Sequence, residues 1–360
     1  MDTTSDLATM MSTTAGGLGD SNGFNILERI YSTYIPQVYL IPKVLKTTMY
    51  VIGFPGNLLA CILWLQKPFL HSSGCYLAAL AISDLLFLVL SLVHDLENLW
   101  KVNVLNNGIL CKGFPSLFLL FQYLSPLLTL AFTVERFISI RFPLERRVYC
   151  NIRRAVVVII SLTFLSLCVS AVQVHIWEYN LEATSCLVKE DIVWLWTPWT
   201  WATECTMFMF VPIVILIFNV IVIRTLKNAK RRARSLYGNG PPKHRTATTK
   251  MLLIVSFFFI FTTLPVSIVY SLLDNFLPGD LNVNIAEDTR WQRHFRFAVI
   301  REVIYDLGIS HYVCNFYIYL LTGKRFRQGI KRCIYRFSKR DSMDRSSRSL
   351  RSSFTELRSM

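Results

Sequence analysis

The sequence predicts an all-α membrane protein, a bundle of seven transmembrane helices followed by an amphipathic eighth helix on the inner leaflet. Hydrophobic residues make up 53% of the 360-residue chain and charged residues only 17%, and soluble chains of this length carry more charge. Mean hydropathy is positive, at +0.41. Seven apolar stretches are each long enough to cross about 30 Å of hydrocarbon.

The predicted spans follow one another without an internal repeat. Residues 1–43 hold no basic stretch followed by an apolar one, so no cleavable signal peptide is expected. An odd number of spans does not suit an inverted-repeat transporter. The spans cover about residues 44–66, 75–98, 113–140, 154–175, 202–223, 250–273 and 298–321.

Lys and Arg are unevenly distributed between the connections. With the N-terminus outside, the four inner segments hold 23 of these cations and the four outer segments hold 8. Because inner connections carry the excess of cations, the N-terminus is predicted outside and the C-terminus in the cytoplasm. The net charge of +15 therefore lies mostly where anionic lipid attracts it, and nucleic acid is not an expected partner.

The predicted organisation has four parts. A flexible extracellular tail (1–43) precedes the membrane domain (44–322), an amphipathic helix follows (323–337), and a Ser/Arg-rich cytoplasmic tail ends the chain (338–360). Cys333 is a candidate for palmitoylation in the amphipathic helix. The tail serines that follow arginines are candidates for phosphorylation, which would attract receptor kinases and an arrestin-like partner; these are Ser346, Ser349, Ser352 and Ser353.

Only two of the nine cysteines are predicted at the oxidising outer face. Cys111 stands at the start of the third span and Cys186 lies in the outer segment 176–200. We expect these two thiols to form a disulfide that holds the outer loop over the mouth of the bundle.

Polar residues and prolines recur at particular places within the spans. Taken together, they resemble the motifs of rhodopsin-like (class A) G-protein-coupled receptors, over about residues 44–337. The motifs are Gly56-Asn57, Leu80-Ala81-Ile82-Ser83-Asp84-Leu85, Glu135-Arg136-Phe137, Pro212, Pro265, Asn315-Phe316-Tyr317-Ile318-Tyr319 and Lys324-Arg325-Phe326-Arg327.

The resemblance implies roles for these residues. Glu135 would hold Arg136 at rest and release it to meet a G protein, and Tyr319 would swing inward on activation. The activation switch would comprise Glu135, Arg136, Phe137, Pro212, Phe259, Pro265, Asn315 and Tyr319. Asp84, facing Ser125 and Asn315 and grouped with Asn57, implies an allosteric sodium ion; a hydrogen-bonded cluster without an ion is the alternative.

Several positions depart from the family pattern. Phe137 replaces a Tyr, Phe316 replaces the Pro of the last motif, and Thr263 stands where an aromatic residue is expected, so Phe259 is expected to take over its role. Ser161 stands where a Trp is expected. These departures affect the details of the switch.

Acidic and aromatic residues predict the chemistry of the ligand. No Lys occurs in 298–321 to bind retinal, and no acid in 114–122 to bind an amine. Acids and tryptophans gather instead at the predicted mouth, which suits a cationic amidated peptide. The candidate ligand-binding residues are Asp95, Gln122, Glu204, Tyr270, Glu302 and Asp306, with Glu204 and Asp306 expected to face the cavity.

The predicted function is a plasma-membrane receptor, without enzyme activity, that activates heterotrimeric G proteins. The stretch Leu77–Leu85, the Glu-Arg-Phe variant and the last motif resemble invertebrate neuropeptide receptors, particularly the FMRFamide-like group. The alternatives are a chemosensory or other small-ligand class A receptor, and a membrane transporter.

Overall fold

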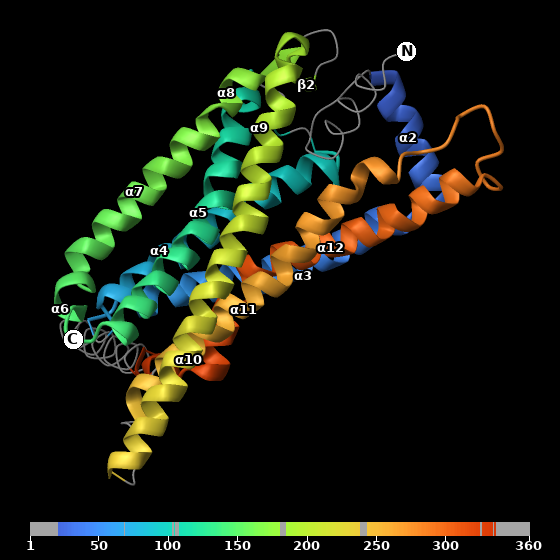
Figure 1. The fold of residues 1–360 in the computed structure, drawn as a ribbon. Coiled ribbons are helices and arrows are strands. Elements are labelled where there is room, and N and C mark those ends of the chain that lie inside the picture. Colours follow the sequence, from blue (N-terminus) through green and yellow to red (C-terminus); the bar gives the residue numbers. More distant parts are fainter. Residues whose placement is uncertain are drawn as a thin grey trace, which may run out of the picture.

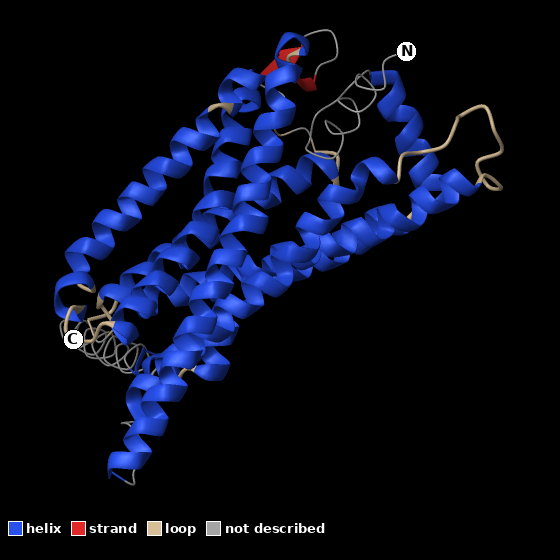
Figure 2. Ribbon diagram, in the orientation of Figure 1, coloured by secondary structure: helices blue, strands red, loops and turns tan. Residues whose placement is uncertain are grey.

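The computed structural model describes residues 21–67, 69–102, 104, 108–180, 185–237, 243–324, 326–333 and 335. Helices make up nearly all of this part, and one short hairpin lies at the end of the bundle near the N-terminal helix (Figure 1, Figure 2). The end with the hairpin is called the outer end here, and the opposite end the inner end.

Seven long helical segments run side by side and confirm the predicted bundle. Six of them are long and apolar enough to cross a membrane. The seventh, α12, has 34 residues and packs against α3 and α11. The segments are α3 (Gln37–Trp64), α4 (Ser72–Asn98), α5 (Gly108–Arg141), α7 (Ile152–Ala171), the continuous run of α9 (Val193–Cys205), η2 (Thr206–Phe210) and α10 (Val211–Tyr237), then α11 (Lys243–Leu272) and α12 (Thr289–Thr322).

Shorter elements complete the described fold. They are α2 (Ser21–Tyr34), α6 (Arg146–Tyr149), α8 (Gln173–Ile176), β1 (Trp177–Asn180), β2 (Ser185–Val188), η1 (Glu190–Ile192) and η3 (Leu273–Asn275). The segment η2 is a π-helical turn.

Several helices extend beyond their predicted spans at the outer end. The predicted flexible tail 1–43 is helical over Ser21–Tyr34 and from Gln37 onward, and α12 begins at Thr289 rather than near 298. A span prediction marks only the residues that cross hydrocarbon, whereas a helix continues wherever it can bury an apolar face. Here α2 and the outer part of α12 bury such faces together, in a cluster that includes Tyr31, Trp291 and Phe295.

The predicted outer loop 176–200 is largely ordered. Strands β1 and β2 pair antiparallel, with Tyr179 opposite Cys186. Residues from Val193 onward belong to α9. The second part of this segment is therefore an outward extension of the fifth helix, with Trp196 buried and Trp194 75% exposed.

The helices approach closely where small side chains allow it. At Gly308 on α12 a Cβ atom would lie 2.6 Å from Val266 Cγ2 on α11, closer than real side chains pack. Asp288 caps the start of α12, where its side chain accepts a hydrogen bond from the Arg290 N–H.

Residue 324 and residues 326–333 are helical, which confirms a short helix after the seventh span. Phe326 is buried against Trp64 and Tyr319, at ring distances of 5.3 and 5.5 Å. Ile334, Arg336 and Phe337 of the predicted helix 323–337 lie outside the described residues.

Candidate functional site

A cavity of about 410 Å3 opens among the helices toward the outer end. It is lined by α3, α4, α5, the hairpin, α9, η2, α11 and α12. Four of the six predicted ligand-binding residues line it, namely Asp95, Gln122, Glu204 and Tyr270. The wall also contains Phe114, Phe118, Trp196, Phe208 and Tyr312.

Glu204 places a carboxylate in the wall of the cavity. Its Oε1 accepts a hydrogen bond of 2.9 Å from the Tyr123 hydroxyl, and that hydroxyl also lies 3.2 Å from Thr203 Oγ1. Among the described residues Glu204 forms no ion pair. Its carboxyl group is therefore held in place by a neutral donor.

Asp95 is already compensated by a cation. Its Oδ1 lies 2.9 Å from Lys46 Nζ, and the Tyr50 hydroxyl donates to its Oδ2. His94 Nδ1 lies 3.7 Å from the same carboxylate. The sequence prediction of an acidic mouth overlooked Lys46, although a lone cation in an apolar run is a signal of a buried partner.

Glu302 and Asp306 do not line the cavity. Glu302 accepts from Arg301 at 2.9 Å. Asp306 is 1% exposed, and neither of its carboxylate oxygens has a hydrogen-bond partner within the described ranges. Asp306 is therefore not among the residues that line the cavity, whereas the preceding residue Tyr305 is, and a role of Asp306 in ligand binding stays a prediction.

The predicted disulfide is confirmed. Cys111 and Cys186 are bonded, with their Cα atoms 5.5 Å apart. The bond attaches β2 to the start of α5, where both cysteines line the cavity. The hairpin is therefore fixed over the cavity wall.

A polar network lies deeper in the bundle around Asp84. This residue is fully buried, and its two oxygens accept from Ser125 Oγ and Asn315 Nδ2, each at 2.7 Å. Asn57 donates instead to the carbonyls of Gly53 and Tyr312, at 3.1 and 2.8 Å, and its Oδ1 has no partner. Oxygen donors of this kind suit a hard cation, and the sodium ion stays a prediction.

Toward the inner end, Glu135 is not paired with Arg136. Its carboxylate accepts from the hydroxyls of Ser72 and Ser73, the first residues of α4. Within the described part of the chain Arg136 forms no ion pair, and its Nε has no hydrogen-bond partner. The expected resting pair is therefore replaced by a contact between Glu135 and the N-terminus of α4.

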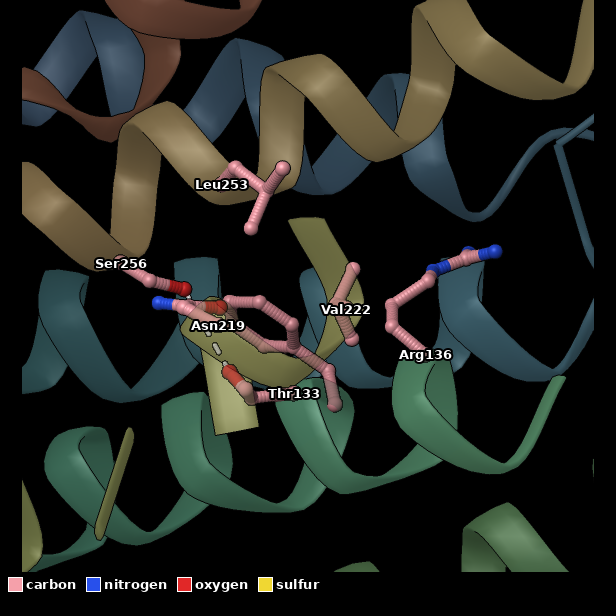
Figure 3. Close-up of a pocket in the computed structure, with 7 residues that line it drawn as sticks. Thr133, Arg136, Asn219, Val222, Leu253 and Ser256 are labelled. Carbon is pink, nitrogen blue, oxygen red and sulfur yellow. Dashed lines mark hydrogen bonds between the residues drawn. The ribbon is translucent and has the colours of Figure 1, made fainter. Parts of the chain in front are cut away.

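Arg136 helps to line a small pocket toward the inner end of the bundle. This pocket has a volume of only about 10 Å3, roughly enough for one water molecule. Figure 3 shows Arg136 extending away from Thr133, Asn219 and Ser256. Thr133 Oγ1 and Ser256 Oγ lie 3.3 Å apart and link α5 to α11 across this pocket.

His71 lies at the N-cap of α4, next to this site. Its Nδ1 accepts a hydrogen bond of 3.1 Å from the Gly74 N–H. Burial lowers the pKa of His71, and the nearby positive charge of Arg136 lowers the pKa further. The neutral ring is therefore free to accept the capping bond.

The other predicted switch residues occupy packed positions. Phe137 packs on Phe218 at 5.1 Å, Phe259 meets the edge of His311 at 5.1 Å, and Tyr319 packs on Trp64 at 5.5 Å. Pro265 lies inside α11 and Pro212 at the start of α10.

Two further groups of predictions concern the C-terminal region. Cys333 is partly buried, and Gln66 Nε2 lies 3.7 Å from its sulfur; palmitoylation stays a prediction. The phosphorylation candidates Ser346, Ser349, Ser352 and Ser353 lie outside the described residues.

Comparison with known proteins identifies the class. The family model described as 7 transmembrane receptor (rhodopsin family) matches residues 56–322. The chain belongs to this family, the class A G-protein-coupled receptors, and is a multi-pass membrane protein and not an enzyme. This membership decides against the transporter alternative.

Several curated receptors are similar to the chain. Growth hormone secretagogue receptor type 1 of Oryctolagus cuniculus is 30% identical over 283 residues, which cover 73% of this chain and 76% of that receptor. Galanin receptor 2b of Danio rerio is 24% identical over 306 residues, covering 81% and 74%. Thyrotropin-releasing hormone receptor of Gallus gallus is 26% identical over 185 residues, covering 49% and 44%.

Proposed function

We propose that this protein is a plasma-membrane receptor for an extracellular cationic amidated peptide and activates heterotrimeric G proteins. Its N-terminus would be extracellular and its C-terminus cytoplasmic, as the distribution of Lys and Arg indicates. The similar receptors are peptide hormone receptors, which supports a peptide ligand.

The observation that carries the proposal is Glu204 in the wall of the outer cavity. Asp95 is compensated by Lys46, whereas Glu204 is held by the neutral Tyr123 hydroxyl. A ligand guanidinium or ammonium group can pair with this carboxylate, and aromatic residues of the wall, such as Phe118 and Trp196, can pack on its apolar parts.

Activation would take place at the opposite end. The pocket that Arg136 helps to line has a volume of only about 10 Å3, and we interpret the described conformation as the resting one. A ligand activates such a receptor by binding an open conformation more tightly than the resting one. Arg136, which is partly exposed and has no ion-pair partner among the described residues, is the group that we expect to contact the G protein.

Within this class, the sequence motifs favour an FMRFamide-like neuropeptide. The size of the outer cavity also favours a small ligand, because its volume of about 410 Å3 falls within the range of small-molecule sites. A short amidated peptide that inserts only its C-terminal residues would fit the same volume.

The test uses cells that express the full chain. A panel of amidated peptides, including FMRFamide-like sequences, is applied while calcium and cAMP are measured. Each active peptide is compared with its free acid and with an analogue in which arginine is replaced by uncharged citrulline.

The expected result is a response that Arg136→Ala abolishes at equal surface expression, and that citrulline weakens. Responses to small chemosensory compounds alone would replace the peptide proposal. A receptor that stimulates no G protein with any ligand would contradict the proposed function.

A further inference from the structure

Two prolines inside the spans remove a hydrogen-bond donor from their own helices. Proline has no N–H, so the carbonyl four residues earlier loses its usual helical partner. For Pro126 on α5 this carbonyl belongs to Gln122. For Pro212 on α10 the residue four positions earlier is Phe208, which lies in the π-helical turn η2, where the Val211 N–H bonds to Thr206 five residues back. Both prolines are buried, where an unpaired carbonyl is unfavourable.

In each case a hydroxyl from another helix donates to the carbonyl. Tyr312 Oη on α12 donates to the Gln122 carbonyl at 3.1 Å. Ser267 Oγ on α11 donates to the Phe208 carbonyl at 2.7 Å. These two contacts, called the latch bonds below, join α12 to α5 and α11 to η2.

A neighbouring contact shows what distinguishes the latch bonds. Tyr317 Oη also donates across helices, to the Ile52 carbonyl on α3 at 3.0 Å. The residue four positions after Ile52 is Gly56, which keeps its N–H. The Ile52 carbonyl therefore has a helical donor of its own, and we expect the loss of the Tyr317 bond to have little effect.

The latch bonds lie in the walls of the outer cavity. Gln122, Phe208 and Tyr312 line the cavity directly, and Ser267 follows the lining residue Val266. The bonds are present in the conformation that we interpret as the resting one. Any contact that must break when helices α11 and α12 move stabilises that resting conformation.

We propose that Tyr312 and Ser267 are positioning residues that hold the receptor in its resting conformation by donating to the Gln122 and Phe208 carbonyls, which lie four residues before Pro126 and Pro212. A ligand in the cavity would contact the same walls and weaken these bonds. The signalling consequence rests on the proposed function, whereas the pairing of each hydroxyl with its proline does not.

The first experiment is a double-mutant cycle on ligand-independent signalling. Tyr312→Phe should raise basal activity roughly fivefold, which corresponds to the loss of about one net hydrogen bond from the resting state. In the Pro126→Ala background the restored N–H satisfies Gln122, so Tyr312→Phe should then change basal activity less than about twofold. Equal effects in both backgrounds would overturn the proposal for Tyr312.

The second cycle pairs Ser267→Ala with Pro212→Ala, with the same expectation. Ser267→Thr keeps the hydroxyl and should restore the wild-type basal level. The matched controls are Tyr317→Phe and Ser271→Ala. Ser271 lies one turn further along α11, and among the described residues its hydroxyl donates to the Ser267 carbonyl of the same helix. Controls that raise basal activity as much as the latch variants would contradict the assignment.

The same cycles are measured as Tm on purified protein, which keeps the two proposals separate. Tyr312→Phe and Ser267→Ala should lower Tm in the wild-type background and leave it nearly unchanged after the matching Pro→Ala substitution. Absence of this coupling overturns the latch bonds even in a signalling receptor. Coupling in Tm without G-protein activation by any ligand would support the latch bonds and refute the proposed function.

Discussion

The Tyr123 hydroxyl on α5 donates a 2.9 Å hydrogen bond to Glu204 on α9, and this bond joins the third helical segment to the fifth. Tyr123 is 1% exposed, while Glu204 lines the cavity. A ligand cation that approaches Glu204 therefore contacts a carboxylate that is already connected to the packed interior of the bundle.

Glu204→Gln should weaken a cationic peptide by roughly tenfold to one-hundredfold in potency, because the substitution removes the charge and keeps a hydrogen-bond acceptor. Radioligand competition and calcium responses measure the effect. Tyr123→Phe serves as the comparison, since it removes the donor and keeps the charge. An equal loss of potency for a peptide and its citrulline analogue would show that Glu204 acts only in packing.

Lys46→Met should destabilise the receptor by about 3–5 kcal/mol, since it leaves the buried carboxylate of Asp95 without its cation. Thermal unfolding of the purified protein measures this. The double variant Lys46→Met/Asp95→Asn should be closer to wild type than Lys46→Met. Full additivity of the two substitutions would show that the pair is not coupled.

Ser72→Ala/Ser73→Ala should lower agonist potency about tenfold. Without the two hydroxyls, the buried Glu135 carboxylate must find another donor, and Arg136 is the adjacent cation; pairing would retain Arg136 in the resting state. Calcium or cAMP dose–response curves measure the shift. Thr47→Ala/Thr48→Ala is the control, because these exposed hydroxyls bond only to their own helix. The Ser72/Ser73 effect should vanish in a Glu135→Gln background.

The contact between α2 and the outer part of α12 should weaken as pH falls. His294 lies before the predicted span 298–321, accepts from or donates to Tyr31 Oη at 2.6 Å, and contacts the Phe276 carbonyl at 2.6 Å. Burial lowers the pKa of His294, the bond to Phe276 opposes this, and the charge of Arg301 adds to the lowering.

The sign follows from the two states of His294. When α2 is undocked, His294 is solvated and binds a proton below its usual pKa of about 6.5. When α2 is docked, the lowered pKa of His294 keeps the ring neutral to lower pH. The free energy that favours docking therefore decreases as pH falls. The protection factors of the α2 amides, which divide out the intrinsic pH dependence of hydrogen exchange, should therefore be lower at about pH 5.5 than at about pH 7.5. His294→Phe should remove this dependence, and a variant that keeps it would exclude His294 as the cause.

Cys186→Ser should cost about 2–5 kcal/mol of stability and impair the ligand response, because the hairpin would no longer be attached to α5. Surface expression and peptide potency measure the two effects. Cys168→Ser is the matched control, since Cys168 is an exposed free cysteine. Unchanged potency in Cys186→Ser would mean that the hairpin does not shape the binding site.

Patterns that depend on chain chemistry alone were predictable. The lengths of the apolar stretches predicted the seven spans. The placement of two cysteines at the outer face predicted the Cys111–Cys186 disulfide. Asp84, Ser125 and Asn315 meet as the family resemblance implies. These features could be predicted because each follows from the thickness of the membrane, the redox environment or the need of a buried acid for hydrogen-bond donors.

Features that depend on helix rotation and on partners from distant segments were not predictable. Asp306 and Glu204 look alike in the sequence, yet only Glu204 lines the cavity. Glu135 was expected to hold Arg136, but the start of α4 brings Ser72 and Ser73 to it instead. The helical extension above the fifth span was missed because tryptophans and prolines are also typical of loops.

The fifth helical segment runs without a break from Val193 through Tyr237. At 1.5 Å per residue it is about 67 Å long, more than twice the thickness of the hydrocarbon layer. Figure 1 shows the inner end of α10 projecting, together with the start of α11, past the other helices. If the receptor is activated as proposed, we expect a ligand that tilts the tryptophan-rich outer part of this segment to displace its inner part in the opposite direction.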